Sequence, residues 1–151
     1  MRLEKRKVIF ALVVYLLALI YVVFLEPSRT GGEHYSAPRW IPLKGTYEMM
    51  IEAGSSRYYW SLFLLNLFGN ILLFMPLGFL GGALSGFPAN KFRIVVIAFL
   101  LSLSIELLQL TLKIGVYDSD DVLLNVLGAY LGLCLFHRFV AKNIIDTYKN
   151  S

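Results

Sequence analysis

The residues that could do chemistry in this sequence interrupt long apolar stretches. Glu106 lies within the apolar run of residues 92–112, and no Lys or Arg lies inside any such run at a similar depth. A carboxylate placed in hydrocarbon needs a proton, water or a cationic partner. Glu106 is therefore either a neutral, protonated acid, or a carboxylate that faces water or a cationic ligand. Either state makes it a candidate for a functional role.

Three aspartates, Asp118, Asp120 and Asp121, directly precede the last apolar run. Asp118 or Asp120 is suited to cap the start of a helix, and Asp121 then lies at the positive end of the helix dipole. Capping uses one or two acids, so the surplus favours a divalent cation such as Mg²⁺ or Ca²⁺, or a cationic group of a ligand. Both interpretations are retained, with these three aspartates as the candidate metal ligands.

Polar side chains on three apolar runs share helix faces and lie at similar depths. Ser102, Glu106 and Gln109 recur at a spacing that places them on one face of a helix. At 1.5 Å of rise per residue, Glu106 and Asn125 lie roughly 6 to 9 Å inside their runs. We therefore predict one outward-facing polar pocket, lined by Asn66, Asn70, Glu106, Gln109, Asp121 and Asn125. Asp118 is a further candidate for ligand binding. Alternatively, Asn66, Ser102 and Gln109 hold helices together by hydrogen bonds.

The composition of the chain indicates that these apolar runs lie in a lipid bilayer. Of 151 residues, 58% are hydrophobic and only 16% are charged, and the mean hydropathy is +0.67. A bilayer core requires about 20 apolar residues in a helix. Four runs meet this length, so the sequence predicts a single-domain, all-α integral membrane protein, a four-helix bundle spanning residues 1–151. The predicted spans are residues 8–25, 61–80, 92–112 and 122–140, and an outer loop of residues 26–60 joins the first two.

Two glycine pairs predict close contact between the spans. Gly78 and Gly82 lie four residues apart in the second span, and Gly128 and Gly132 lie four residues apart in the fourth. Small residues at this spacing let the backbones of membrane helices approach closely.

The distribution of basic residues predicts the orientation. Nine of the 14 Lys and Arg lie at one side: before the first span, around the loop between the second and third, or at and beyond the end of the fourth. Basic residues are concentrated on the cytoplasmic side of membrane proteins, so both termini are predicted to be cytoplasmic. They form no patch with interleaved aromatics, which argues against a nucleic-acid partner. The single cysteine, Cys134, is read as a small buried hydrophobe.

Three linked motifs in the sequence resemble the VanZ-like family, which is named after a protein associated with teicoplanin resistance in Gram-positive bacteria. The first extends from Asn66 and Asn70 through Pro76 and Gly78; the second is Ser-Ile-Glu106-Leu-Leu-Gln109. The third runs from Asp118-Ser-Asp120-Asp121 through Asn125 to Gly128 and Gly132. Together they cover about half of the chain, and the resemblance implies a bacterial plasma-membrane protein. Family members often carry an Arg just before the first Asp, where this chain has Gly115.

Three functions are compatible with these features. The first is a non-enzymatic protein that binds a cell-wall lipid intermediate and so alters how glycopeptide antibiotics meet the cell surface. The second is an intramembrane enzyme acting on a lipid headgroup, with Glu106 as general acid or base, Asp121 as a further catalytic candidate and a divalent cation on the aspartates. The third is a small lipid or proton-coupled transporter, which with four spans would need to form a homo-oligomer.

Overall fold

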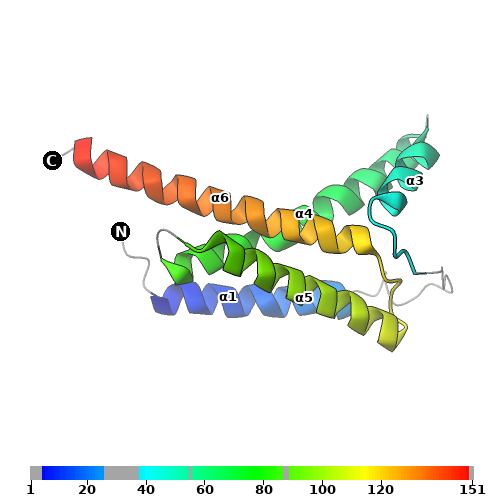
Figure 1. Cartoon of the computed structure of the whole chain (residues 1–151), viewed down its shortest axis with the longest axis horizontal. Helices are drawn as coiled ribbons and strands as arrows, with labels where there is room; N and C mark the ends of the chain where they lie inside the picture. The colour runs from blue at the N-terminus through cyan, green and yellow to red at the C-terminus, as the bar shows by residue number, and fades with distance from the viewer. Residues whose placement is uncertain (1–4, 26–37, 55, 87–88, 150–151) are drawn as a thin grey trace.

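The computed structural model describes residues 5–25, 38–54, 56–86 and 89–149, with side chains as far as Val140. Within this part of the chain, four helices are long and apolar enough to cross a membrane (Figure 1). The predicted all-α, four-helix membrane bundle is thus confirmed. Its elements are α1 (Lys5–Ile20), continued by the π-helix η1 (Tyr21–Leu25), then α3 (Lys44–Ala53), α4 (Arg57–Ser85), α5 (Lys91–Leu112) and α6 (Ser119–Lys149).

The helices extend beyond most of the predicted span limits. The second span, predicted as residues 61–80, lies within the longer helix α4, which begins at Arg57 and ends at Ser85. Hydropathy marks only the part of a helix that suits hydrocarbon, whereas backbone hydrogen bonding continues into the interface. Of the predicted outer loop, residues 26–37 and 55 lie outside the described residues, and α3 occupies much of the rest.

The outer surface of the bundle is apolar. Phe10 is 71% exposed, Leu65 70% and Phe92 77%. Large apolar side chains arranged in this way on three helices would be unfavourable in water but match a lipid environment. Inside the bundle, Phe74, Ala98 and Ala129 are fully buried and join α4, α5 and α6 in one core.

Helices α4 and α6 run in the same direction (Figure 1), and among the described elements they share the most extensive contact. A Cβ atom added to Gly128 would lie 2.1 Å from the carbonyl oxygen of Ile71, and one added to Gly132 would lie 1.9 Å from that of Met75. From the other side, a Cβ on Gly78 would lie 1.7 Å from the carbonyl oxygen of Ala129. The predicted role of the glycine pairs in close approach is confirmed.

The bundle has two ends of different charge. At the acidic end, the first turn of α6 carries Asp120 and Asp121, and α3 lies beside the first turns of α4 (Figure 1). At the basic end, α1 begins with a run of basic residues and α5 begins at Lys91. The polar residues of interest gather at the acidic end.

Candidate functional site

The start of α6 is held by two carboxylates from different parts of the chain. Asp118 precedes the first residue of α6, and its Oδ1 accepts a hydrogen bond from the Asp120 backbone N–H at 2.9 Å. The backbone N–H of Asp118 donates to Glu106 Oε2 at 2.9 Å. Asp118 thus caps α6, as predicted for Asp118 or Asp120, and Glu106 from α5 satisfies a second backbone donor beside it. Glu106 is only 3% exposed, and this helix start supplies the polar partner that its burial requires.

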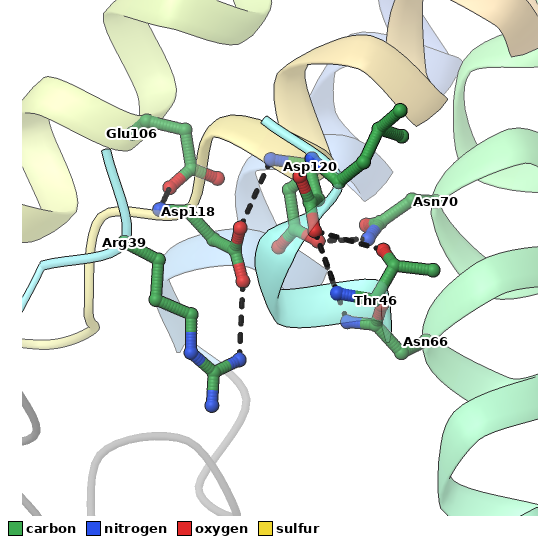
Figure 2. A network of polar contacts seen from close by, with 9 residues as sticks. Arg39, Thr46, Asn66, Asn70, Glu106, Asp118 and Asp120 are labelled. Carbon is green, nitrogen blue, oxygen red and sulfur yellow. Dashed lines mark hydrogen bonds and ion pairs between the residues drawn. The ribbon is translucent and has the colours of Figure 1, made fainter. Parts of the chain in front are cut away.

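Asp120 caps a different helix, α3 in the outer segment (Figure 2). Its carboxylate accepts hydrogen bonds from the backbone N–H of Leu43 and of Thr46, the latter at 2.7 Å, and from the Thr46 hydroxyl at 2.9 Å. The side chain of Leu43, the residue before α3, makes no capping bond, and its φ of 66° is left-handed. Asp120 therefore provides from α6 the cap that α3 lacks in its own sequence, with its charge at the positive end of the α3 dipole.

Arg39 joins the outer segment to Asp118 (Figure 2). Its guanidinium lies 3.2 Å from Asp118 Oδ2. The Arg39 backbone N–H donates to the Tyr117 carbonyl at 2.8 Å, and its carbonyl accepts from Ser119 N–H at 3.0 Å. The Trp40 ring stacks on Tyr117 with centroids 4.3 Å apart. These contacts attach the described outer segment to the start of α6 by backbone, charge and aromatic packing together.

Gly45 makes this close attachment sterically allowed. A Cβ atom at Gly45 would lie 3.0 Å from Arg39 Cδ and 3.2 Å from Asp120 Oδ2. Because both separations are shorter than ordinary van der Waals contact, a larger residue would push the guanidinium and the carboxylate away from α3.

Asp121 connects α6 to α4. Its Oδ1 accepts hydrogen bonds from Asn70 Nδ2 at 2.6 Å and from Asn66 Nδ2 at 3.3 Å. Asn66 and Asn70 project from successive turns of α4 toward the start of α6 (Figure 2). Asp121 is half-buried, whereas Asn70 is buried. We call these three residues the amide–carboxylate group.

Two other predicted pocket residues have partners elsewhere. Gln109 Nε2 donates to the carbonyl of Val23 at 3.2 Å, near the end of η1, where helix carbonyls lack intrahelical partners. Asn125 Nδ2 donates to Ser102 Oγ at 2.9 Å between α6 and α5, and Asn125 Oδ1 is buried without a hydrogen-bond partner. The structure therefore divides the predicted pocket lining among separate hydrogen-bonded groups, with Asp121, Asn66 and Asn70 together and Glu106 beside Asp118.

The three aspartates proposed as metal ligands have different partners. Asp118 contacts Arg39, Asp120 contacts α3, and Asp121 contacts the two asparagines. Among the described residues, no group of three or more His, Cys, Asp or Glu side chains is arranged to hold a metal ion.

Comparison with known protein families gives a match over most of the chain. The family model described as VanZ/LLP1 matches residues 12–141, most of the chain. The chain belongs to the VanZ/LLP1 family. No curated protein and no solved structure matches it.

In this VanZ/LLP1 chain, the cationic partner of Asp118 comes from the outer segment and not from the loop just before Asp118. Gly115 occupies the position where the resemblance led us to expect an Arg, and a Cβ there would lie 3.3 Å from Gln109 Cβ. The cation that pairs with Asp118 is instead Arg39. Sequence reasoning missed Arg39, Thr46 and Gly45 as site residues. The available signal was the adjacent Arg39 and Trp40, a basic and an aromatic residue together in the predicted outer loop.

Burial shifts the pKa of the Asp118 carboxyl upward from the ordinary value for aspartate. Burial raises its pKa above the ordinary 3.8, while the Asp120 N–H and Arg39 oppose the shift. A raised pKa means that the folded chain binds this proton more tightly than the unfolded chain does. The resulting stabilisation is fully present below pH 3.8 and is lost as pH rises through the folded pKa. Acidification from neutral pH should therefore weaken the ion pair between Arg39 and Asp118. Protonation of Asp118 should not lower the free energy of unfolding of the bundle.

Trp40 fluorescence in a Trp60→Phe background can follow this titration, because Trp40 stacks on Tyr117 next to Asp118. We expect its emission to change with a midpoint above pH 3.8, the ordinary pKa of aspartate. Asp118→Asn, which mimics the protonated acid, should show the low-pH emission at neutral pH and lose the transition. An unaltered transition in Asp118→Asn would assign the titration to another group.

Proposed function

We propose that this protein resides in a bacterial plasma membrane, with its basic end in the cytoplasm and its acidic end outward. The excess of Lys and Arg near α1, α5 and the end of α6 supports this orientation. Under it, α3, the amide–carboxylate group and the stacked Trp40 and Tyr117 all lie at the outer surface of the membrane.

At that surface, the protein binds the headgroup of a cell-wall lipid intermediate and alters how teicoplanin meets the cell. The observation that carries this proposal is the amide–carboxylate group, Asp121 with Asn66 and Asn70, at the interface between α4 and α6. Carboxylate and carboxamide oxygens accept hydrogen bonds from hydroxyl, amide and ammonium groups, and carboxamides also donate them. These are the polar groups of a sugar–peptide headgroup.

The charge of the site supports the same type of ligand. Glu106, Asp118 and Asp120 are already hydrogen-bonded to the backbone or to Arg39, so their roles are structural. Asp121 accepts hydrogen bonds from two neutral carboxamides and is half-buried rather than enclosed. A cationic or hydroxyl group of a ligand would therefore be favoured beside Asp121 rather than beside the other three acids.

Expression of the chain in a susceptible Gram-positive host tests the proposal. We expect decreased teicoplanin susceptibility and altered binding of labelled drug at the cell surface. Asp121→Asn should lower the affinity for the headgroup by about tenfold or more, because a charge-assisted hydrogen bond contributes about 1.5–3 kcal/mol. Both effects on the drug should decrease accordingly. Asn66→Ala should change them in the same direction.

Glu48→Gln is the matched control, because it removes the same charge from an exposed carboxylate of α3 that pairs with Lys44 at the surface. It should retain full activity. Membrane abundance and thermal stability of all variants must be equal for the comparison to hold. Unchanged drug susceptibility on expression of the wild-type chain, or full activity of Asp121→Asn, would refute the proposal.

A further inference from the structure

A cavity of about 300 Å³ lies at the basic end of the bundle, opposite the acidic site. It opens between α1, α4 and α5, and its walls are mostly apolar side chains from all three helices. One cationic side chain, Arg93, also lines it. The cavity wall includes Leu12, Leu77, Gly81, Ile94, Ile97 and Arg93.

Gly81 creates part of this space and has no role in the contact between α4 and α6. A Cβ added to Gly81 would meet only Ile94, at 3.7 Å, an ordinary van der Waals distance. By contrast, a Cβ on its neighbour Gly82 would lie 2.6 Å from the Phe136 ring. Gly82 therefore serves helix packing, whereas Gly81 leaves a side chain's volume empty at the cavity wall.

Arg93 places a positive charge at the edge of this apolar space. Within the described residues, no carboxylate forms an ion pair with its guanidinium. Its backbone N–H donates to the Asn90 side chain, which caps the start of α5, so the positive end of the α5 dipole lies here as well. Lys91 adds a further positive charge beside it.

We propose that this cavity binds an anionic phospholipid of the adjoining leaflet, with one acyl chain against Leu12, Leu77 and Ile97 and the phosphate at Arg93. The volume is at the lower end for small-molecule sites, which suits a single chain rather than a whole lipid. Basic pockets between membrane helices recognise anionic headgroups by charge, and apolar walls retain the chain. Neither feature alone would distinguish this lipid from bulk lipid; together they select an anionic amphiphile.

Thermal unfolding of the purified full-length chain in detergent tests this proposal. Phosphatidylglycerol should raise the melting temperature at concentrations about tenfold lower than phosphatidylcholine with the same acyl chains, because a charge-assisted contact to phosphate is added. Glycerol phosphate, which carries the anion without acyl chains, should have no effect over the same range.

Arg93→Gln should abolish the preference for phosphatidylglycerol, and Gly81→Leu, which fills the cavity, should weaken binding of both lipids. Arg138→Gln is the matched control, since it removes the same charge from an exposed position at the basic end that is outside the cavity. It should retain the preference. Because Arg93 is exposed, Arg93→Gln decides the outcome even if Gly81→Leu does not fold.

Three results would overturn the proposal. The first is equal stabilisation of the wild-type chain by the two lipids. The second is stabilisation by glycerol phosphate as strong as that by phosphatidylglycerol, which would indicate an anion site without an acyl chain. The third is a pattern in which the two arginine variants do not differ: either Arg93→Gln keeps the preference for phosphatidylglycerol, or Arg138→Gln loses as much of it as Arg93→Gln does.

Discussion

Gly128→Ala separates α4 from α6 and destabilises the folded chain by about 3 kcal/mol, at the upper end for overpacking of a well-packed core. The added methyl group would lie 2.1 Å from the carbonyl oxygen of Ile71, which belongs to a helix backbone and has no rotamer through which to move away. The helices must therefore shift apart. Since Asn66 and Asn70 reach Asp121 across the same interface, the amide–carboxylate group should be lost with the packing.

Unfolding by denaturing detergent, followed by tryptophan fluorescence, measures this effect. Gly69→Ala is the matched control, because it makes the same substitution in α4 at a position with nothing within 4 Å of the added Cβ. It should change stability by no more than about 1 kcal/mol, in the stabilising direction, because alanine is the better helix former. Equal stabilities for Gly128→Ala and Gly69→Ala would show that α4 and α6 are not in close backbone contact.

Asp120→Asn is expected to release α3 from the start of α6. The carboxylate is 2% exposed and accepts three hydrogen bonds from Leu43 and Thr46. An asparagine of the same size would turn an N–H₂ group toward these donors and leave at least one of them buried without an acceptor. Charge-assisted hydrogen bonds contribute about 1.5–3 kcal/mol each, so we expect a loss of about 3 kcal/mol in the docking of this segment.

Hydrogen exchange at the Thr46 amide and its neighbours in α3 provides the measurement. Exchange there should become much faster in Asp120→Asn, whereas the amides in the middle of α5 should keep their protection. Glu48→Gln, which removes an exposed carboxylate from α3 itself, should change the free energy of opening at these amides by less than about 0.5 kcal/mol. Thr46→Val combined with Asp120→Asn should be less than additive, because the two side chains share one hydrogen bond. Slow exchange at Thr46 in Asp120→Asn would mean that other contacts hold α3.

The sequence alone predicts the parts of the fold that depend on the solvent and on local spacing. Apolar runs must be helical in lipid, because every backbone polar group there needs an internal partner, so four spans follow from hydropathy. The spacing of Gly78 and Gly82, and of Gly128 and Gly132, predicts close packing because it places small residues on one face of each helix. The acids before the last span predict a helix cap by Asp118 or Asp120, since capping depends on the residue type and its place in the chain.

The partners of the polar residues depend on tertiary structure. The sequence assigns Asn66, Asn70 and Asp121 to one predicted pocket, but only the parallel packing of α4 on α6 brings them into hydrogen-bond contact. Hydropathy and helix periodicity identify no partner for Glu106 or Asp120. The donors that satisfy these carboxylates are backbone N–H groups and a threonine from elsewhere in the chain.

Sequence by itself therefore determined the membrane class, the helices and the polar residues that interrupt them, because each follows from composition and local periodicity. The tertiary structure decided which of these acids have structural roles. Asp118 and Asp120 hold the outer segment and Glu106 supports the start of α6, while Asp121 and its two asparagines join α6 to α4. Every backbone group carries the same donor and acceptor, so its partner is set by the packing of distant segments and not by the identity of its own residue.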